Sequence, residues 1–351
     1  MDVSSIWWTQ VGSSVRLLER IVERLRGERS FTLVLPQPLA WPDTFYSLVK
    51  DHACSISAER TLHYAVYDGS SDPGDFVLQE FCPPEFRARY WPGDSCAEYL
   101  CQGEKLLFSS CFVWIKGIQT RAALRAWQTF VADYEKAAAA LPIHAVFVLE
   151  YSGAPVDDSG EALLYQPTER DCRIFCLQAA DCGDPALDIY LAELALKLGR
   201  GVPELSGRLL TLGTRLLQDP RGAALSLEGA LSSTGDPLPV LSDAFVRSAV
   251  WEAQIAWVFP LLERFRVRVV DQYADRLFPR LPIPNSNGDP IRVPYDLEFG
   301  ALYFLGSTGG VFYRSEDFNG IILCRDARNT LAHNNFLSYA SICELLRQLS
   351  A

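Results

Sequence analysis

The sequence has little that would mark a secreted, membrane-spanning or metal-binding protein. Its first eight residues place no basic segment before an apolar run and show no small-residue cleavage site, so no secretory signal is predicted. No apolar run approaches the length of a membrane span. The ten cysteines form no C-x-x-C pair, and several lie in apolar runs. We therefore predict reduced core thiols, no metal site, no membrane partner and a cytoplasmic location.

Positive charge is also scarce. The formal net charge of −11 argues against broad electrostatic binding of nucleic acid. Residues 242–351 contain no lysine, 11 arginines and 12 acidic residues, so nearly all of the acidic excess belongs to the first 241 residues. Because arginine forks onto phosphate oxygens, the C-terminal part can still present a local phosphate-binding cleft.

The composition is that of a folded protein. Hydrophobic residues make up 49% and charged residues 21% of the 351 positions, without a low-complexity tract. A chain of this length exceeds what one hydrophobic core usually supports. We therefore expect two domains that each bury a core, of class α/β plus all-α.

The N-terminal half alternates between apolar runs and amphipathic helices. Helical periodicity is clear at 12–27 and 119–140. Most apolar runs are continuous, which is typical of strands covered on both faces. The predicted strands are 31–35, 62–67, 110–115, 143–149 and 172–177. This alternation predicts a three-layer α/β domain with a mainly parallel sheet over residues 1–183.

The predicted domain lacks the residues of a nucleotide site. The turn after its first strand, 36–44, has no glycine or lysine and contains three prolines, which cannot donate from the backbone. The strand ending at Lys116 has lysine where a magnesium-handling enzyme carries aspartate. Glu150 ends another strand and is interpreted as a solvated rim residue. No cofactor is predicted, and the lack of a phosphate loop argues against an active ATPase.

The order of these elements resembles the P-loop NTPase family, particularly degenerate STAND-like modules that have lost their catalytic motifs. The resemblance covers roughly residues 28–180. It implies that the N-terminal domain acts as a sensor or as a binding site for a protein partner.

The C-terminal half reads as helices. Helices at 185–198 and 203–218, followed by a turn-rich stretch, predict a helical connector over 184–241. Residues 242–351 are predicted as an all-α domain. Its expected segments are a long helix at 242–278, an irregular proline-rich stretch at 279–294, a helix at 295–306, a loop at 307–320, a helix at 321–334 and a last helix from the Ser338 cap to Leu349.

One motif in this region combines the residue types needed for RNA cleavage. It reads Arg328-Asn329-Thr330-Leu331-Ala332-His333. Helical geometry predicts that Asn329 and His333 share a face with Arg325, while Arg328 points to the side. A histidine can move a proton from a ribose 2′-hydroxyl, arginine can offset the charge that develops, and asparagine can orient the reacting groups. No acidic cluster accompanies them, so metal assistance is not implied.

The motif resembles that of the HEPN superfamily, helical domains of prokaryotic toxins and defence systems with an R-x(4–6)-H motif. The resemblance covers about residues 242–351. It implies a four-helix bundle that dimerises so that two motifs form one composite ribonuclease site. By matching positions, Arg328 binds the scissile phosphate, His333 transfers protons and Asn329 supports them.

Two further arginines, Arg325 and Arg264, are candidates for RNA contacts. For Glu263, Arg264 and Arg266 on the long helix, a solvated helix face is the preferred interpretation. The simplest alternative for the motif itself is a surface histidine beside ordinary solvated arginines.

The sequence thus predicts a metal-independent endoribonuclease effector of a prokaryotic toxin or anti-phage system. It would act on RNA, with tRNA among the candidate substrates, as a homodimer through its helical domain and under control of the α/β domain. The alternative is a non-enzymatic assembly subunit of a larger defence complex, in which Arg328 and His333 are structural. A buried His333 with its nitrogens satisfied would favour the subunit, and a solvent-facing His333 near its two-fold mate would favour the nuclease.

Overall fold

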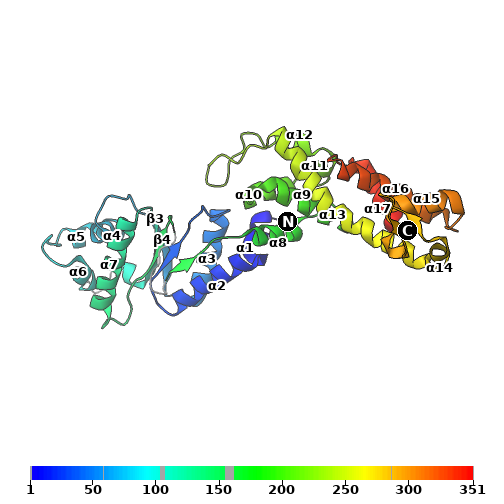
Figure 1. The fold of residues 1–351 in the computed structure, drawn as a ribbon. Helices are drawn as coiled ribbons and strands as arrows, with labels where there is room; N and C mark the ends of the chain where they lie inside the picture. Colours follow the sequence, from blue (N-terminus) through cyan, green and yellow to red (C-terminus); the bar gives the residue numbers. More distant parts are fainter. Residues whose placement is uncertain (1, 58, 103–106, 155–161, 286, 351) are drawn as a thin grey trace. The chain divides into compact units, whose positions relative to one another are not determined.

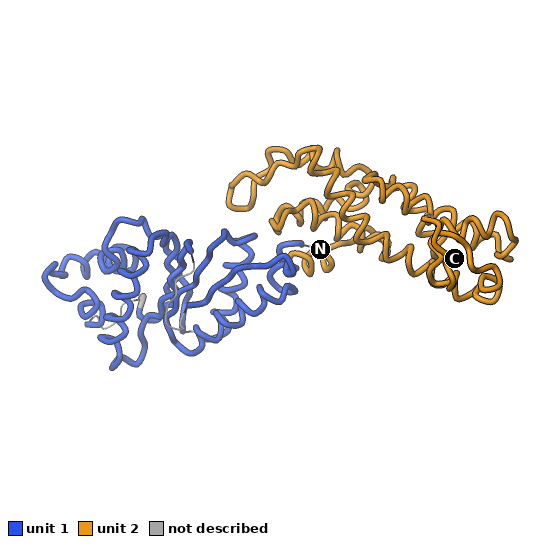
Figure 2. The backbone as a smooth tube through the Cα atoms, viewed as in Figure 1, with its two compact units in different colours: residues 1–171 blue, residues 172–351 orange. Residues whose placement is uncertain are grey.

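The computed structural model describes residues 2–350 except 58, 103–106, 155–161 and 286. It divides into two compact units, residues 1–171 and 172–351 (Figure 2). The chain is mixed α/β. The first unit holds a five-stranded sheet, and the second is built mainly from helices (Figure 1).

The sheet of the first unit is parallel, as the sequence predicts. Its strands are β1 (Phe31–Val34), β2 (Thr61–Val66), β3 (Cys111–Ile118), β4 (Val146–Tyr151) and β5 (Leu163–Leu164). They lie in the order β2-β3-β4-β1-β5, and each described pairing is parallel. β1 and β4 are buried along their whole length, whereas β2 at the sheet edge alternates between buried and exposed residues.

Helices cover both faces of this sheet, which confirms the predicted three layers (Figure 1). On one face, Trp114 of β3 packs edge-on against Phe45. On the other, Phe147 of β4 packs against Phe130. The first layer is α1 (Val3–Gln10), α2 (Gly12–Arg26) and α3 (Pro42–Ile56); the second is α4 (Pro73–Phe81), α6 (Cys96–Cys101) and α7 (Arg121–Ala138), with α5 (Pro84–Arg87) between α4 and α6.

The strand predicted at 172–177 is wrong, because these residues lie in α8 (Glu169–Ala179). The buried residues Cys172, Phe175 and Cys176 follow the i, i+3, i+4 spacing of a helix face. The side chain of Asp171 accepts hydrogen bonds from the backbone N–H and hydroxyl of Thr168, while that hydroxyl accepts from the N–H of Asp171. This reciprocal cap starts a helix just before the apolar run.

The second unit begins inside α8, earlier than the predicted boundary at residue 183. α9 (Pro185–Gly199) packs along the long helix α13 (Asp243–Gln272), with the rings of Tyr190 and Trp257 stacked 5.0 Å apart. The segment expected as a connector is therefore part of this unit's core. The other helices of this segment are α10 (Pro203–Leu210), α11 (Thr214–Gln218) and α12 (Pro220–Leu225).

Beyond α13 the chain forms α14 (Ala274–Leu277) and enters the proline-rich segment at 279–294. That segment contains a short antiparallel ribbon of β6 (Ile283–Pro284) and β7 (Pro290–Ile291). The last helices are α15 (Phe299–Gly309), α16 (Ser315–Ala332) and α17 (Tyr339–Ser350). Ser338 caps α17 as predicted, because its hydroxyl accepts from the N–H of Ser341 at 3.1 Å.

The loop predicted at 307–320 is largely wrong. Its glycines and polar residues were interpreted as turn signals, yet α15 extends to Gly309 and α16 starts at Ser315. Gly320 lies where any Cβ would collide with the ring of Phe265 on α13. This glycine therefore permits a close approach of two helices, and it does not break one.

Candidate active site at the end of α16

The predicted motif occupies the last turn of α16. The helix ends at Ala332, and His333 is its C-cap, with φ −94° and ψ 22°. The N–H of His333 donates to the carbonyl of Asn329 at 3.1 Å, and Asn334 adopts a left-handed conformation with φ 57°. The side chains of Asn329 and His333 are exposed. His333 thus follows the helix instead of lying within it, so the helix predicted to residue 334 ends two residues early.

The chain on both sides of His333 is anchored to α13. Before it, the indole N–H of Trp251 donates to the carbonyl of Leu331 at 2.8 Å. After it, the buried side chain of Gln254 donates to the carbonyl of Leu337 at 2.9 Å and accepts from its N–H at 2.7 Å. Gln254 also donates to the hydroxyl of Tyr190 at 2.9 Å. These bonds fix the backbone around a histidine whose ring stays in solvent.

Arg325 and Arg328, one turn apart, both contact α15 or its N-cap. The guanidinium of Arg325 lies 3.9 Å from the ring centroid of Tyr303 and donates to Asp326 at 2.9 and 3.0 Å. Hydrogen bonding to Asp326 raises the pKa of Arg325. Arg325 and Asn329 lie one turn apart in α16, as predicted, and the side chain of Arg325 turns toward Tyr303 of α15.

Arg328 makes one loose ion pair. Its Nη2 donates to Oε2 of Glu298 at 3.0 Å, and the two side chains are 42% and 73% exposed. Exposed pairs of this kind contribute about 0–1 kcal/mol. Arg328 can therefore exchange Glu298 for another anion at small cost.

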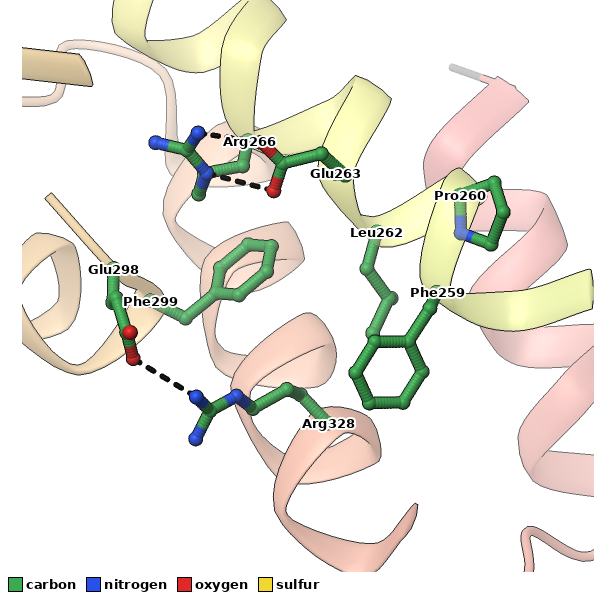
Figure 3. Close-up of a pocket in the computed structure, with 8 residues that line it drawn as sticks. All are labelled: Phe259, Pro260, Leu262, Glu263, Arg266, Glu298, Phe299 and Arg328. Carbon is green, nitrogen blue, oxygen red and sulfur yellow. Dashed lines mark hydrogen bonds and ion pairs between the residues drawn. The ribbon is translucent and has the colours of Figure 1, made fainter. Parts of the chain in front are cut away.

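Arg328 lines a pocket of about 440 Å³ between α13, the start of α15, and α16 (Figure 3). Four of its lining residues are apolar and four are charged. They are Phe259, Pro260, Leu262 and Phe299, and Glu263, Arg266, Glu298 and Arg328. The pocket has the size of a small-ligand site, with apolar walls and a few polar groups.

Of Glu263, Arg264 and Arg266 on α13, the solvated-face interpretation is wrong for Arg266, whose side chain is only 15% exposed, while the other two are exposed. Glu263 and Arg266 line the pocket, whereas Arg264 is exposed and lies outside its lining. Nε of Arg266 donates to Glu263 at 2.9 Å, and its Nη1 donates to the carbonyls of Tyr295 and Leu297 at 2.7 and 3.1 Å. Arg266 thus ties α13 to the chain that leads into α15, and its hydrogen bond with Glu263 lowers the pKa of that carboxyl.

The structure therefore brings only some of the predicted site residues together. Arg328 opens into the pocket and Arg325 lies beside it on α16, while Asn329 and His333 lie outside the lining. Sequence reasoning missed Glu298, whose only signal was its place just before an apolar helix. It also missed Gln254, a single amide on the buried face of α13.

The first unit carries a separate polar cluster, and the solvated-rim interpretation of Glu150 is wrong. Its carboxylate is buried at 7% exposure. The Tyr46 hydroxyl donates to this carboxylate and lies 2.9 Å from each of its two oxygens. The indole N–H of Trp114 donates to Oε2 at 2.7 Å. Burial raises the pKa of Glu150. The ammonium of Lys116 lies 3.2 Å from the ring centroid of Tyr46, and burial lowers the pKa of Lys116.

The turn after β1 is engaged by an indole. Nε1 of Trp8 donates to the carbonyls of Ala40 and Trp41 at 2.9 and 3.3 Å. Trp41, which precedes α3, is held in a left-handed conformation with φ 48°. In this turn, carbonyl oxygens accept from a core tryptophan where a phosphate loop would point N–H groups at a ligand.

The described residues hold no metal-binding cluster, no disulfide and no membrane-spanning helix. No group of three or more His, Cys, Asp or Glu side chains there could hold a metal ion. All ten cysteines are free thiols. No helix in the described part of the chain combines the length and apolarity needed to cross a membrane.

The chain matches no protein-family model and no curated protein sequence.

Proposed function

We propose that this protein is a metal-independent endoribonuclease that cleaves RNA by attack of a ribose 2′-hydroxyl on the adjacent phosphate. The observation that carries the proposal is the environment of His333. Its ring is exposed at the end of α16, its backbone is held by the anchors at Leu331 and Leu337, and a weakly engaged Arg328 lies on the preceding turn. A solvent-exposed histidine five residues after a releasable arginine supplies the proton-transfer group and the cation that phosphodiester chemistry needs.

In the proposed reaction, His333 takes the proton of the 2′-hydroxyl. The 2′-oxygen forms a bond to phosphorus, and the bond from phosphorus to the 5′-oxygen breaks. The leaving oxygen takes a proton from water or from His333 of a second copy, which gives a 2′,3′-cyclic phosphate and a 5′-hydroxyl. Arg328 binds the phosphate as charge develops, and Asn329 orients the RNA.

The biological setting is proposed to be a prokaryotic toxin or anti-phage system, with tRNA among the candidate substrates. The helical unit would form a homodimer, and the α/β unit would regulate the nuclease by binding a protein partner. Support for a regulatory α/β unit comes from its turn after β1, where Trp8 engages the backbone carbonyls. That chemistry favours a protein-sensing role over nucleotide hydrolysis.

The experiment compares the wild-type protein with His333→Ala and Arg328→Ala on total RNA and purified tRNA in EDTA, and scores growth arrest on expression. Both variants should lose cleavage by at least about 100-fold, as expected for loss of a proton-transfer group. Arg347→Ala, at an exposed arginine of α17, is the matched control and should cleave as the wild type does. Equal cleavage by His333→Ala and wild type would refute the assignment.

The second candidate, a non-enzymatic assembly subunit, is favoured by one surface. A groove of about 820 Å³ lies between the β6–β7 ribbon and α15, and it is lined by Ile291, Phe304 and Glu298 among others. Phe304 is 55% exposed there. Absence of RNA cleavage by the wild type, together with loss of complex assembly in Phe304→Ser, would favour this role.

A further inference from the structure

The pocket beside Arg328 has flat apolar walls. Phe299 is the first residue of α15 and is buried, and Phe259 and Leu262 come from α13. Figure 3 shows these three side chains reaching into the same space from the two helices. Aromatic walls suit a planar ring, because every nucleobase has a face that can stack on them.

The two ion pairs at the rim of this pocket differ in how firmly they are held. Arg266 binds Glu263 and two backbone carbonyls, so its role is to hold the wall together. Among the described residues, Arg328 donates one side-chain hydrogen bond, to Oε2 of Glu298. Oε1 of Glu298 has no hydrogen bond among the described residues. Glu298 is therefore the rim carboxylate that can accept from a ligand.

We propose that this pocket binds the nucleobase next to the scissile phosphate, and that Glu298 recognises its amino edge while releasing Arg328 to the phosphate. This inference rests on the proposed ribonuclease function and names its substrate preference. A base that donates to Glu298 replaces the hydrogen bond that Arg328 gives up. The same base positions its own phosphate near the released guanidinium. Correct base binding and phosphate binding are thereby coupled through one side chain.

The chemistry of a carboxylate decides which base fits. Guanine presents a ring N–H and an amino group side by side, so it satisfies both oxygens of Glu298. Adenine and cytosine present an amino group beside an acceptor nitrogen, and uracil flanks its N–H with two carbonyls. The expected preference is guanine first, adenine and cytosine next, and uracil last.

The test has a binding arm and a cleavage arm, both with the full-length chain. In the binding arm, calorimetry measures the affinity of guanosine 3′-monophosphate and of uridine 3′-monophosphate for two proteins. One carries His333→Ala alone, and the other carries His333→Ala together with Glu298→Gln. Guanosine monophosphate should bind at least about 10-fold more tightly than the uridine nucleotide, and Glu298→Gln should reduce that ratio to below about 3-fold. Phe259→Ala should weaken the binding of both nucleotides by about 10-fold.

In the cleavage arm, RNA oligomers that differ only in the base beside the cleaved bond are compared in wild type, Glu298→Gln and Glu344→Gln. Glu344 is an exposed glutamate of α17 outside the pocket and serves as the matched control. Glu298→Gln should lose base preference, whereas Glu344→Gln should keep it. Thermal unfolding of each variant checks that folding is retained.

The outcomes separate the two proposals. Cleavage by wild type with a base preference that Glu298→Gln leaves unchanged overturns the base pocket and leaves the nuclease standing. Selective guanosine binding that depends on Glu298, without RNA cleavage by wild type, supports the base pocket and overturns the nuclease. Equal binding of both nucleotides by the His333→Ala protein also overturns the base pocket.

Discussion

At the scale of single residues, the backbone that follows His333 depends on one buried amide. Gln254 is 1% exposed and satisfies both backbone groups of Leu337, which lies four residues beyond His333. Removing it leaves a buried donor and a buried acceptor unpaired, and each costs about 1–3 kcal/mol. The position of His333 is therefore coupled to the packing of α13.

We accordingly expect Gln254→Ala to lower the free energy of unfolding by about 2–4 kcal/mol. RNA cleavage should fall with it, because the backbone after His333 loses its anchor. Urea unfolding and hydrogen exchange across residues 333–338 measure the two effects. Gln348→Ala, which removes a single bond to the carbonyl of Glu316, should cost no more than about 1 kcal/mol. A Gln254→Ala protein as stable and as protected as that control would contradict the anchor.

Glu150 gives a pH-dependent prediction for the first unit. Burial raises the pKa of its carboxyl, against the opposing hydrogen bonds from Trp114 and Tyr46. A carboxyl whose pKa is higher in the folded protein contributes its full stability below its ordinary pKa and loses it as pH rises through the folded value. Glutamine cannot ionise. The free energy of unfolding of Glu150→Gln should therefore be lowest relative to that of wild type at about pH 4, and should rise relative to wild type by about pH 7.

Denaturant unfolding of the two proteins across this range, followed by tryptophan fluorescence, tests the prediction. Glu80→Gln, at an exposed glutamate of α4, is the control and should show a constant difference from wild type. If Glu150→Gln instead lost stability relative to wild type as pH rises, the prediction would be contradicted, and burial of a charged Glu150 would not limit stability.

At the scale of elements, close packing of α13 and α16 sets the geometry of the site. Gly320 of α16 touches the ring of Phe265, and the buried carboxylate of Asp317 accepts from the Tyr273 hydroxyl at 2.7 Å. Arg328 reaches the pocket wall from the same helix. Any change that separates the two helices should therefore disturb the pocket.

We predict that Gly320→Ala destabilises the protein by about 1–3 kcal/mol, because its methyl group overpacks against Phe265. Gly300→Ala on α15 is the matched control, since a Cβ there meets nothing within 4 Å. The control should be neutral or stabilising by up to about 1 kcal/mol, because alanine favours a helix over glycine. Thermal unfolding distinguishes the two, and equal effects would show that the helices are not in tight contact.

Sequence periodicity recovered most elements because it reports burial along one segment. The buried strands β1 and β4 appear as apolar runs, and the amphipathic helices α2 and α7 keep a clear apolar face. The run at 172–177 misled because five apolar residues in a six-residue segment are too few to separate strand from helix by content alone. Its helical cap at Thr168 carried the deciding information.

The site was harder to predict than the elements, because its residues meet only through tertiary packing. Arg328 and His333 stand in one local motif, so the sequence singles them out together, but only Arg328 lines the pocket. Glu298 lies 30 residues from Arg328, and no local pattern relates the two. The burial of Glu150 depends on the Tyr46 side chain of α3, 104 residues away. A single sequence contains no signal for such pairings.

At the scale of the whole molecule, the chain is acidic, so the proposed RNA contacts must be few and local. Arg325 and Arg328 are the arginines of α16 available to phosphates, and both have carboxylate partners in the structure. We therefore predict a shallow salt dependence of RNA binding, with a log–log slope below about 3 even for a dimer. Fluorescence anisotropy of the His333→Ala protein measures it. A slope of about 6 or more would indicate an extended basic surface instead.

The most direct test of the central claim is cleavage in EDTA of a tRNA whose cut position has been mapped, with and without a single 2′-deoxy substitution there. We predict fragments ending in a 2′,3′-cyclic phosphate and a 5′-hydroxyl, no cut at the deoxy position, and no cut by His333→Ala. Cleavage at the deoxy position, or fragments with a 3′-hydroxyl and a 5′-phosphate, would contradict it.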